Sequence, residues 1–87
     1  MPEFKIEQPF ANDSERAFAE NIQALINNVV VADCRKLAAP IRTLCEPCGV
    51  DMIIGCGGSH VYIHRATEFV AGEHTNANNI RWAIITD

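Results

Sequence analysis

The residues best suited to chemistry are two cysteines three positions apart, in the segment Cys45-Glu46-Pro47-Cys48-Gly49. This spacing is typical of a zinc knuckle, in which two thiolates bind one tetrahedral ion. His64 returns to the base of an expected hairpin and could supply a third ligand, with Asp51 as a fourth. A zinc site at Cys45, Cys48 and His64 is therefore one hypothesis. The alternative is that both cysteines are small core residues at the end of a helix.

A redox cysteine pair and a phosphate-binding loop are both disfavoured, because each motif has the wrong position relative to the expected helices. A redox cysteine pair lies at a helix N-terminus, where the helix dipole lowers the thiol pKa, whereas this pair closes a helix. The glycine-rich segment 55–59 resembles a phosphate-binding loop, but such a loop must lead directly into a helix. A strand follows instead, so a hairpin turn explains these glycines. We therefore expect no cofactor, with zinc as the alternative.

Two helical segments are expected in the first half of the chain, at about 13–31 and 33–47. Asn12 is placed to cap the first segment, with Glu15 as its capping-box partner. Pro40 lies inside the second segment and predicts a kink or a restart near residue 39, so one kinked helix and two helices both remain open. The apolar stripe of the first segment follows helical spacing: Phe18, Ile22, Leu25, Ile26, Val29 and Val30.

The second half changes to the period-two alternation of strands. Strands are expected at about 50–55, 60–71 and 79–86, with a possible short edge strand at 3–7. Because helices and strands are segregated along the chain, the fold class is α+β. The two helical segments should pack on one face of a three- to four-stranded antiparallel sheet, and residues 1–87 should form a single domain.

The register of the expected hairpin follows from which side chains must share a face. Pairing Gly55 with His60 around a four-residue loop places Ile54 opposite Val61, on an apolar face. The same register places Asp51 opposite His64 on the other face.

The second face of this sheet is expected to be partly apolar, with Ile53, Tyr62, Val70, Ala83 and Ile85 on it, while Trp82 is expected in the core. Such a face needs a cover, and a homo-oligomer, most simply a two-fold dimer through the sheet, would provide one. We therefore predict partner contacts at Ile53, Tyr62, Val70 and Ile85. The polar segment 72–79 predicts a loop whose His74, Asn76 and Asn78 could also contact a partner.

Composition excludes several classes of function. The chain has 87 residues and a net charge of −4, and its seven Lys and Arg residues are scattered. Nucleic-acid and membrane-surface binding both need a basic face, so neither is expected. The N-terminal residues lack the pattern of a signal peptide, and no apolar run is long enough to span a bilayer. We expect a cytoplasmic protein with reduced thiols.

The leading hypothesis for function is a small, non-catalytic protein-binding or regulatory accessory module that acts as a homodimer. No credible catalytic constellation is found in the sequence, so an enzyme is less favoured. A zinc-stabilised domain is the first alternative. The second is a small enzyme or ligand-binding protein with a pocket between the helices and the sheet. An accessory protein of a phage or mobile element is the expected setting.

Overall fold

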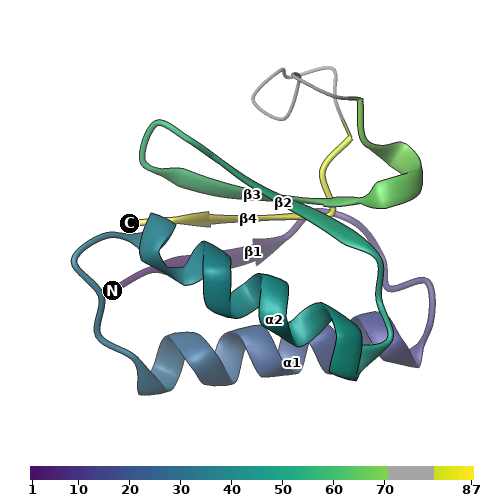
Figure 1. The fold of residues 1–87 in the computed structure, drawn as a ribbon, viewed down its shortest axis with the longest axis horizontal. Helices are drawn as coiled ribbons and strands as arrows, with labels where there is room; N and C mark the ends of the chain where they lie inside the picture. The colour runs from purple at the N-terminus through teal and green to yellow at the C-terminus, as the bar shows by residue number, and fades with distance from the viewer. Residues whose placement is uncertain (71–79) are drawn as a thin grey trace.

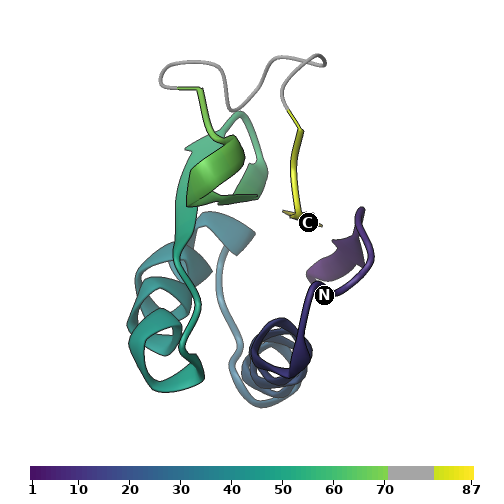
Figure 2. The same ribbon diagram turned by 90° about the vertical axis from the view of Figure 1, so that its right-hand side faces the viewer.

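The computed structural model describes residues 1–70 and 80–87, which fold as two helices packed on one face of a four-stranded antiparallel sheet (Figures 1 and 2). The strand order is β1-β4-β3-β2. The predicted α+β class and the short N-terminal edge strand are confirmed. In chain order the elements are β1 (Glu3–Ile6), α1 (Asp13–Asn28), α2 (Ala38–Cys48), β2 (Met52–Gly57), β3 (His60–Arg65) and β4 (Ala83–Thr86).

Helix α1 begins at the predicted cap. The Asn12 side chain accepts a hydrogen bond from the Glu15 amide (3.0 Å), and the Glu15 carboxylate accepts one from the Ala11 amide (2.9 Å). The helix ends at Asn28, three residues earlier than predicted, because the backbone of Val29 is extended, as β-branched residues favour. Val29 and Val30 are consequently exposed rather than part of the buried stripe.

Helix α2 is separate from α1. Asp33 accepts a hydrogen bond from the Arg35 amide and starts a 3₁₀ turn, Cys34–Leu37, which leads into α2. The proline thus marks a restart rather than a kink, because Pro40 lies in the first turn, where its missing N–H removes no helical bond. At the other end Gly49 adopts a left-handed φ of 70° and its amide bonds to the last carbonyls of the helix.

The β2–β3 hairpin has a different register from the predicted one. Gly57 pairs with His60 around a two-residue turn, and Ile54 pairs with Ile63. The prediction was wrong by two residues because Gly58, with a φ of 60°, permits a tighter turn than the assumed four-residue loop. A shift of two leaves every side chain on its predicted face, but the residue opposite His64 is Ile53 rather than Asp51.

The predicted boundaries of the last two strands were too wide. β3 ends at Arg65 and is followed by a 3₁₀ turn, Ala66–Glu68, so the strand expected to reach residue 71 is shorter. β4 begins only at Ala83, while the prediction started it at residue 79, which lies outside the described residues.

A β-bulge immediately before β4 reverses the predicted faces of that strand. The Trp82 amide donates to the carbonyl of Ile63 (2.8 Å), and Ile63 is also the ladder partner of Ala83. Trp82 and Ala83 therefore both lie opposite Ile63, which is the arrangement of a β-bulge. Both side chains are fully buried. Ile85 shares the face of Ala83, so it is also fully buried in the core and not on the outer face.

The core lies between the two helices and the sheet. Trp82 is at its centre, as predicted, with ring centroids 5.4 Å from Phe18, 6.3 Å from Phe10 and 6.4 Å from Phe4. The other large buried side chains are Ile22, Ile26, Leu37, Ile41, Val61, Ile63 and Ile85. Across residues 1–70 and 80–87, no helix has both the length and the apolar character that crossing a membrane requires.

Candidate functional site

The structure does not bring the three predicted zinc ligands together. Cys45 and Cys48 lie in the last turn of α2, and the Asn21 amide of α1 contacts the Cys48 sulfur at 3.6 Å. His64 lies on the face of β3 opposite to Ile63, so the sheet separates it from the helices. In the part of the chain that the structure describes, no three His, Cys, Asp or Glu side chains gather as a metal ion would need.

The thiols of Cys34 and Cys45 are in environments that favour the protonated form, and none of the four cysteines forms a disulfide. Burial raises the pKa of Cys45. Burial, together with the nearby Asp87 carboxylate, raises the pKa of Cys34 to about 11. The Cys34 thiol is within 3.0 Å of the Ser59 carbonyl, to which it donates. Neither group has the lowered pKa that a nucleophilic cysteine needs.

His64 is fully buried on the outer face of the sheet, the face away from the helices. Its Nδ1 lies 3.1 Å from the carbonyl oxygen of Ile80, and its ring makes an edge contact with Phe69 at a centroid distance of 5.0 Å. The segments after β3 and before β4 therefore pack onto the sheet at this point. The residue opposite His64 is Ile53, so the predicted pairing of Asp51 with His64 across the strands is absent.

Three exposed apolar side chains belong to the segments that contact His64, and we call them the outer patch: Ile53, Val70 and Ile80. Ile53 is the cross-strand neighbour of His64. Val70 follows Phe69, whose ring contacts His64, and Ile80 supplies the carbonyl oxygen that lies beside His64 Nδ1. Their exposed fractions are 37%, 54% and 56%. The patch contains two of the residues predicted from sequence to bind a partner.

The remaining predicted partner residues have different positions. Tyr62 is on the outer face but buried, and the Arg81 guanidinium, which pairs with Glu7, lies over its ring at 5.3 Å. Ile85 is in the core, so its assignment to the partner surface was wrong. His74, Asn76 and Asn78 lie outside the described residues.

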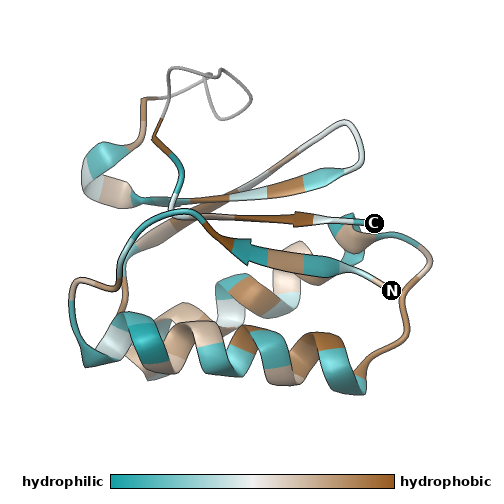
Figure 3. Ribbon diagram, turned by 180° about the vertical axis from the view of Figure 1, so that it is seen from behind, coloured by the Kyte–Doolittle hydropathy of each residue, from teal (hydrophilic) through white to brown (hydrophobic). Residues whose placement is uncertain are grey.

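A groove opens at the end of the molecule where α1 stops, and we call it the end groove. Its volume is about 650 Å³, and it is lined by both terminal segments, the last turn of α1 and the connection at 29–32. Figure 3 shows this connection in the brown of the hydrophobic scale, beside the two termini. Val30 is completely exposed there. The second hypothesis expected a pocket between the helices and the sheet, and this groove lies at one end of that interface, where the last turn of α1 meets the ends of β1 and β4.

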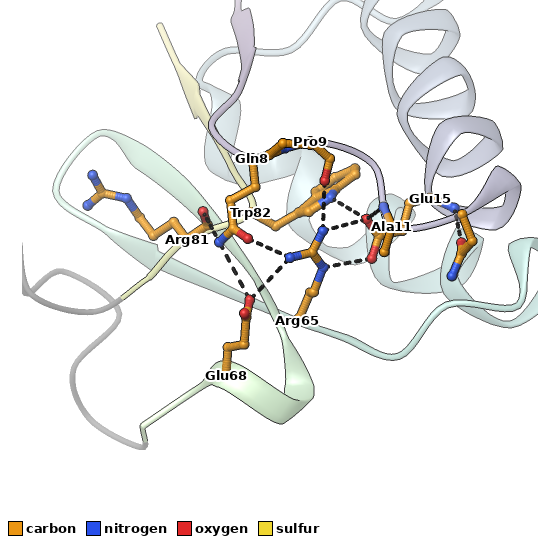
Figure 4. Close-up of polar contacts among 9 residues, drawn as sticks. Gln8, Pro9, Ala11, Glu15, Arg65, Glu68, Arg81 and Trp82 are labelled. Carbon is orange, nitrogen blue, oxygen red and sulfur yellow. Dashed lines mark hydrogen bonds and ion pairs between the residues drawn. The ribbon is translucent and has the colours of Figure 1, made fainter.

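The most extensive polar cluster centres on Glu15 and Arg65, and sequence reasoning missed it (Figure 4). Arg65 Nε and Nη2 donate to the two carboxylate oxygens of Glu15 at 2.7 and 2.8 Å. The indole N–H of Trp82 donates to the same carboxylate at 3.0 Å. Arg65 also donates to the Pro9 carbonyl and to the Gln8 side chain. The cluster thus joins the start of α1 to the end of β3 and the start of β4.

The cluster is arranged to hold a buried charge rather than to react. Hydrogen bonds from Arg65 lower the pKa of Glu15 to about 2, against the opposing effect of burial. Glu15 is only 6% exposed, and its oxygens accept bonds from Arg65, Trp82 and Ala11 together. A general acid or base needs a pKa near the working pH and access to substrate. The cluster therefore has the properties of a structural ion pair.

Comparison with known proteins found no matching family model, no matching curated protein and no matching solved structure.

Proposed function

We propose that this protein is a small, non-catalytic protein-binding module that acts as a homodimer and binds a partner protein through the outer patch. The observation that supports this function is that both helices cover the same face of the sheet (Figure 2), while apolar side chains are exposed in the segments that contact His64 on the other face. Clustered apolar side chains on a folded surface are typical of protein interaction sites. An accessory role in a phage or mobile element belongs to the same proposal.

The size of the molecule is compatible with this function. Its accessible surface is 4986 Å². A standard interface buries about 800 Å² on each partner, which is roughly a sixth of that surface. Binding on this scale would cover the outer patch together with the polar residues around it. It would also stabilise a chain that can bury only a small core by itself.

Substituting the outer patch is expected to abolish partner binding. Ile53→Asp and Ile80→Asp each place a charge in the centre of the proposed interface, and loss of a central contact there costs about 2 kcal/mol or more. Each variant should therefore bind more than tenfold more weakly in affinity capture from the native host, read by quantitative mass spectrometry. Circular dichroism should show both variants folded, because both side chains are exposed.

The control is Val30→Asp, which changes an apolar and still more exposed residue in the end groove. It should capture the same partner as the wild type. If Val30→Asp loses the partner and the patch variants keep it, the outer patch is not the site. The partner protein would then bind at the end groove instead.

Chelation is expected to leave the melting temperature unchanged. Cys45 and Cys48 offer two thiols, and the third predicted ligand, His64, lies across the sheet from them. A structural zinc site normally needs four ligands. Elemental analysis should find far less than one zinc per chain, and EDTA should not shift the thermal melt. Stoichiometric zinc and a melting temperature lowered by EDTA would support the zinc-stabilised alternative instead.

A further inference from the structure

The outer edge of β1 has hydrogen-bonding groups that are free to pair with another strand. β1 is the last strand of the sheet, next to β4. The Glu7 amide donates to the Trp82 carbonyl, so the amides and carbonyls of Glu3 and Lys5 also face β4. Those of Phe4 and Ile6 point outward by alternation. Figure 2 shows β1 at the outer side of the sheet, with α1 beneath it and toward the middle of the molecule.

The opposite edge of the sheet is less available. β2 runs beside α2, and the Arg42 guanidinium donates to the carbonyl of Ile54 at 2.9 Å. A strand that approached β2 would have to displace this bond. Of the two edges, β1 is therefore the one at which an added strand meets less obstruction.

The charges on β1 match a second copy of β1 in one antiparallel register. Glu3 and Lys5 are exposed on the outer face, and within the described residues neither forms an ion pair. If two copies pair about a two-fold axis at Phe4, Glu3 of each lies directly opposite Lys5 of the other. Opposite charges in directly opposed positions stabilise a strand pair, and like charges destabilise it.

Other registers are unfavourable. A shift by two residues places Lys5 opposite Lys5 and Glu3 opposite Glu7, and the reverse shift places Glu3 opposite Glu3. A shift by one places Phe4 opposite Lys5 and mixes the apolar and charged faces. Charged edge strands commonly prevent pairing with unrelated strands, so this pattern admits a second copy while discouraging others.

The same register also satisfies the backbone and the apolar side chains. Phe4 would exchange both of its hydrogen bonds with Phe4 of the second copy, and the Ile6 amide would donate to the Pro2 carbonyl. Pro2 has no amide N–H, and at the end of the pairing this costs only the outermost bond. Phe4 and Ile6 pack on the core but remain half-exposed, so a second copy would cover them.

We propose that two copies of this chain dimerise through antiparallel pairing of their β1 edges, with Glu3 of each copy opposite Lys5 of the other. The proposal rests on the proposed function, which includes a homodimer, and it names the surface that forms it. Pairing about a two-fold axis perpendicular to the sheet joins the two sheets into one. Both outer patches then lie on the same face of the dimer, where a single partner can contact both.

Reversing single charges on β1 is expected to separate the dimer, and mixing the reversed chains is expected to restore it. Glu3→Lys places lysine opposite lysine, and Lys5→Glu places glutamate opposite glutamate. Each variant should weaken dimerisation on the order of tenfold, since two attractive pairs become repulsive. In a one-to-one mixture, both lysines of the first variant face the two glutamates of the second, so the mixture should regain wild-type affinity. Sedimentation equilibrium from micromolar to submillimolar concentration measures all four samples.

Circular dichroism and thermal melts of the dilute variants are the folding control, and they should match the wild type because both side chains are exposed. Dimerisation of the single variants as strong as that of the wild type would overturn the β1 interface, and so would a mixture that stays monomeric. A wild-type chain that is monomeric throughout would overturn the homodimer itself. Partner capture by wild-type and Ile53→Asp chains is independent of these results, so failure of the interface and failure of partner binding are distinguishable.

Discussion

Replacing Arg65 by alanine is expected to lower the free energy of unfolding by about 3–5 kcal/mol. The substitution removes the two hydrogen bonds from Arg65 to the Glu15 carboxylate and leaves a buried charge at the start of α1 without its main partner. It also removes the bonds from Arg65 to the Pro9 carbonyl and the Gln8 side chain, which hold the connection between β1 and α1. Urea unfolding followed by tryptophan fluorescence measures the change, since Trp82 is part of the same cluster.

The matched control is Arg35→Ala. Arg35 also forms a hydrogen-bonded ion pair, with Asp33 at 3.1 Å, but the arginine side chain is 53% exposed. An ion pair in contact with water contributes little to stability, so this variant should unfold close to the wild-type midpoint. Equal losses in the two variants would contradict the assignment of Arg65 to a buried cluster, and so would an Arg65→Ala chain that unfolds at the wild-type midpoint.

Acid is expected to remove about 3 kcal/mol of stability through Glu15 alone. Its pKa is lowered from 4.5 to about 2 in the folded chain, mainly by hydrogen bonds from Arg65. A folded-state pKa below the unfolded value contributes stability that is fully present above pH 4.5. That stability is lost as the pH falls toward 2, because the unfolded chain binds the proton first.

The comparison that isolates this effect is wild type against Glu15→Gln, unfolded by urea at several pH values from 7 to 2. Glutamine keeps an acceptor for the Ala11 and Trp82 N–H groups but carries no charge, so the variant should be less stable at pH 7. The difference between the two chains should shrink below pH 4.5, as Glu15 becomes protonated. A difference that stays constant down to pH 2 would show that the Glu15 charge does not stabilise the fold.

Local signals in the sequence were sufficient to predict the helices and the cap. Asn12 and Glu15 are three residues apart, and their contacts form within one helical turn, so the pattern is visible in the sequence. The same Glu15 also binds Arg65, which is fifty residues away. Nothing in the local pattern distinguishes Arg65 from any other arginine at the end of a strand. The ion pair forms because the sheet packs on α1 in a way that brings Arg65 to Glu15. A local sequence pattern carries no information about this packing.

The sheet was predicted in outline but not in its irregularities. Alternation identified the strand that contains Ile85, but a single bulge at Trp82 reversed the faces of the residues after it. The proposed partner surface changed as a result, because Ile85 moved to the core while Ile53 and Val70 remained exposed. A bulge depends on pairing between strands that are distant in the sequence, so alternation within one strand cannot locate it.

The most direct test of the central claim, that the outer patch is the partner-binding surface, is site-specific photo-crosslinking in the native host. A photoreactive phenylalanine analogue is placed at Ile53 in one chain and at Val30 in another. Position 53 should cross-link to one defined partner protein, and position 30 should not. Cross-linking to that protein from position 30 but not from position 53 would show that the outer patch is not the binding surface.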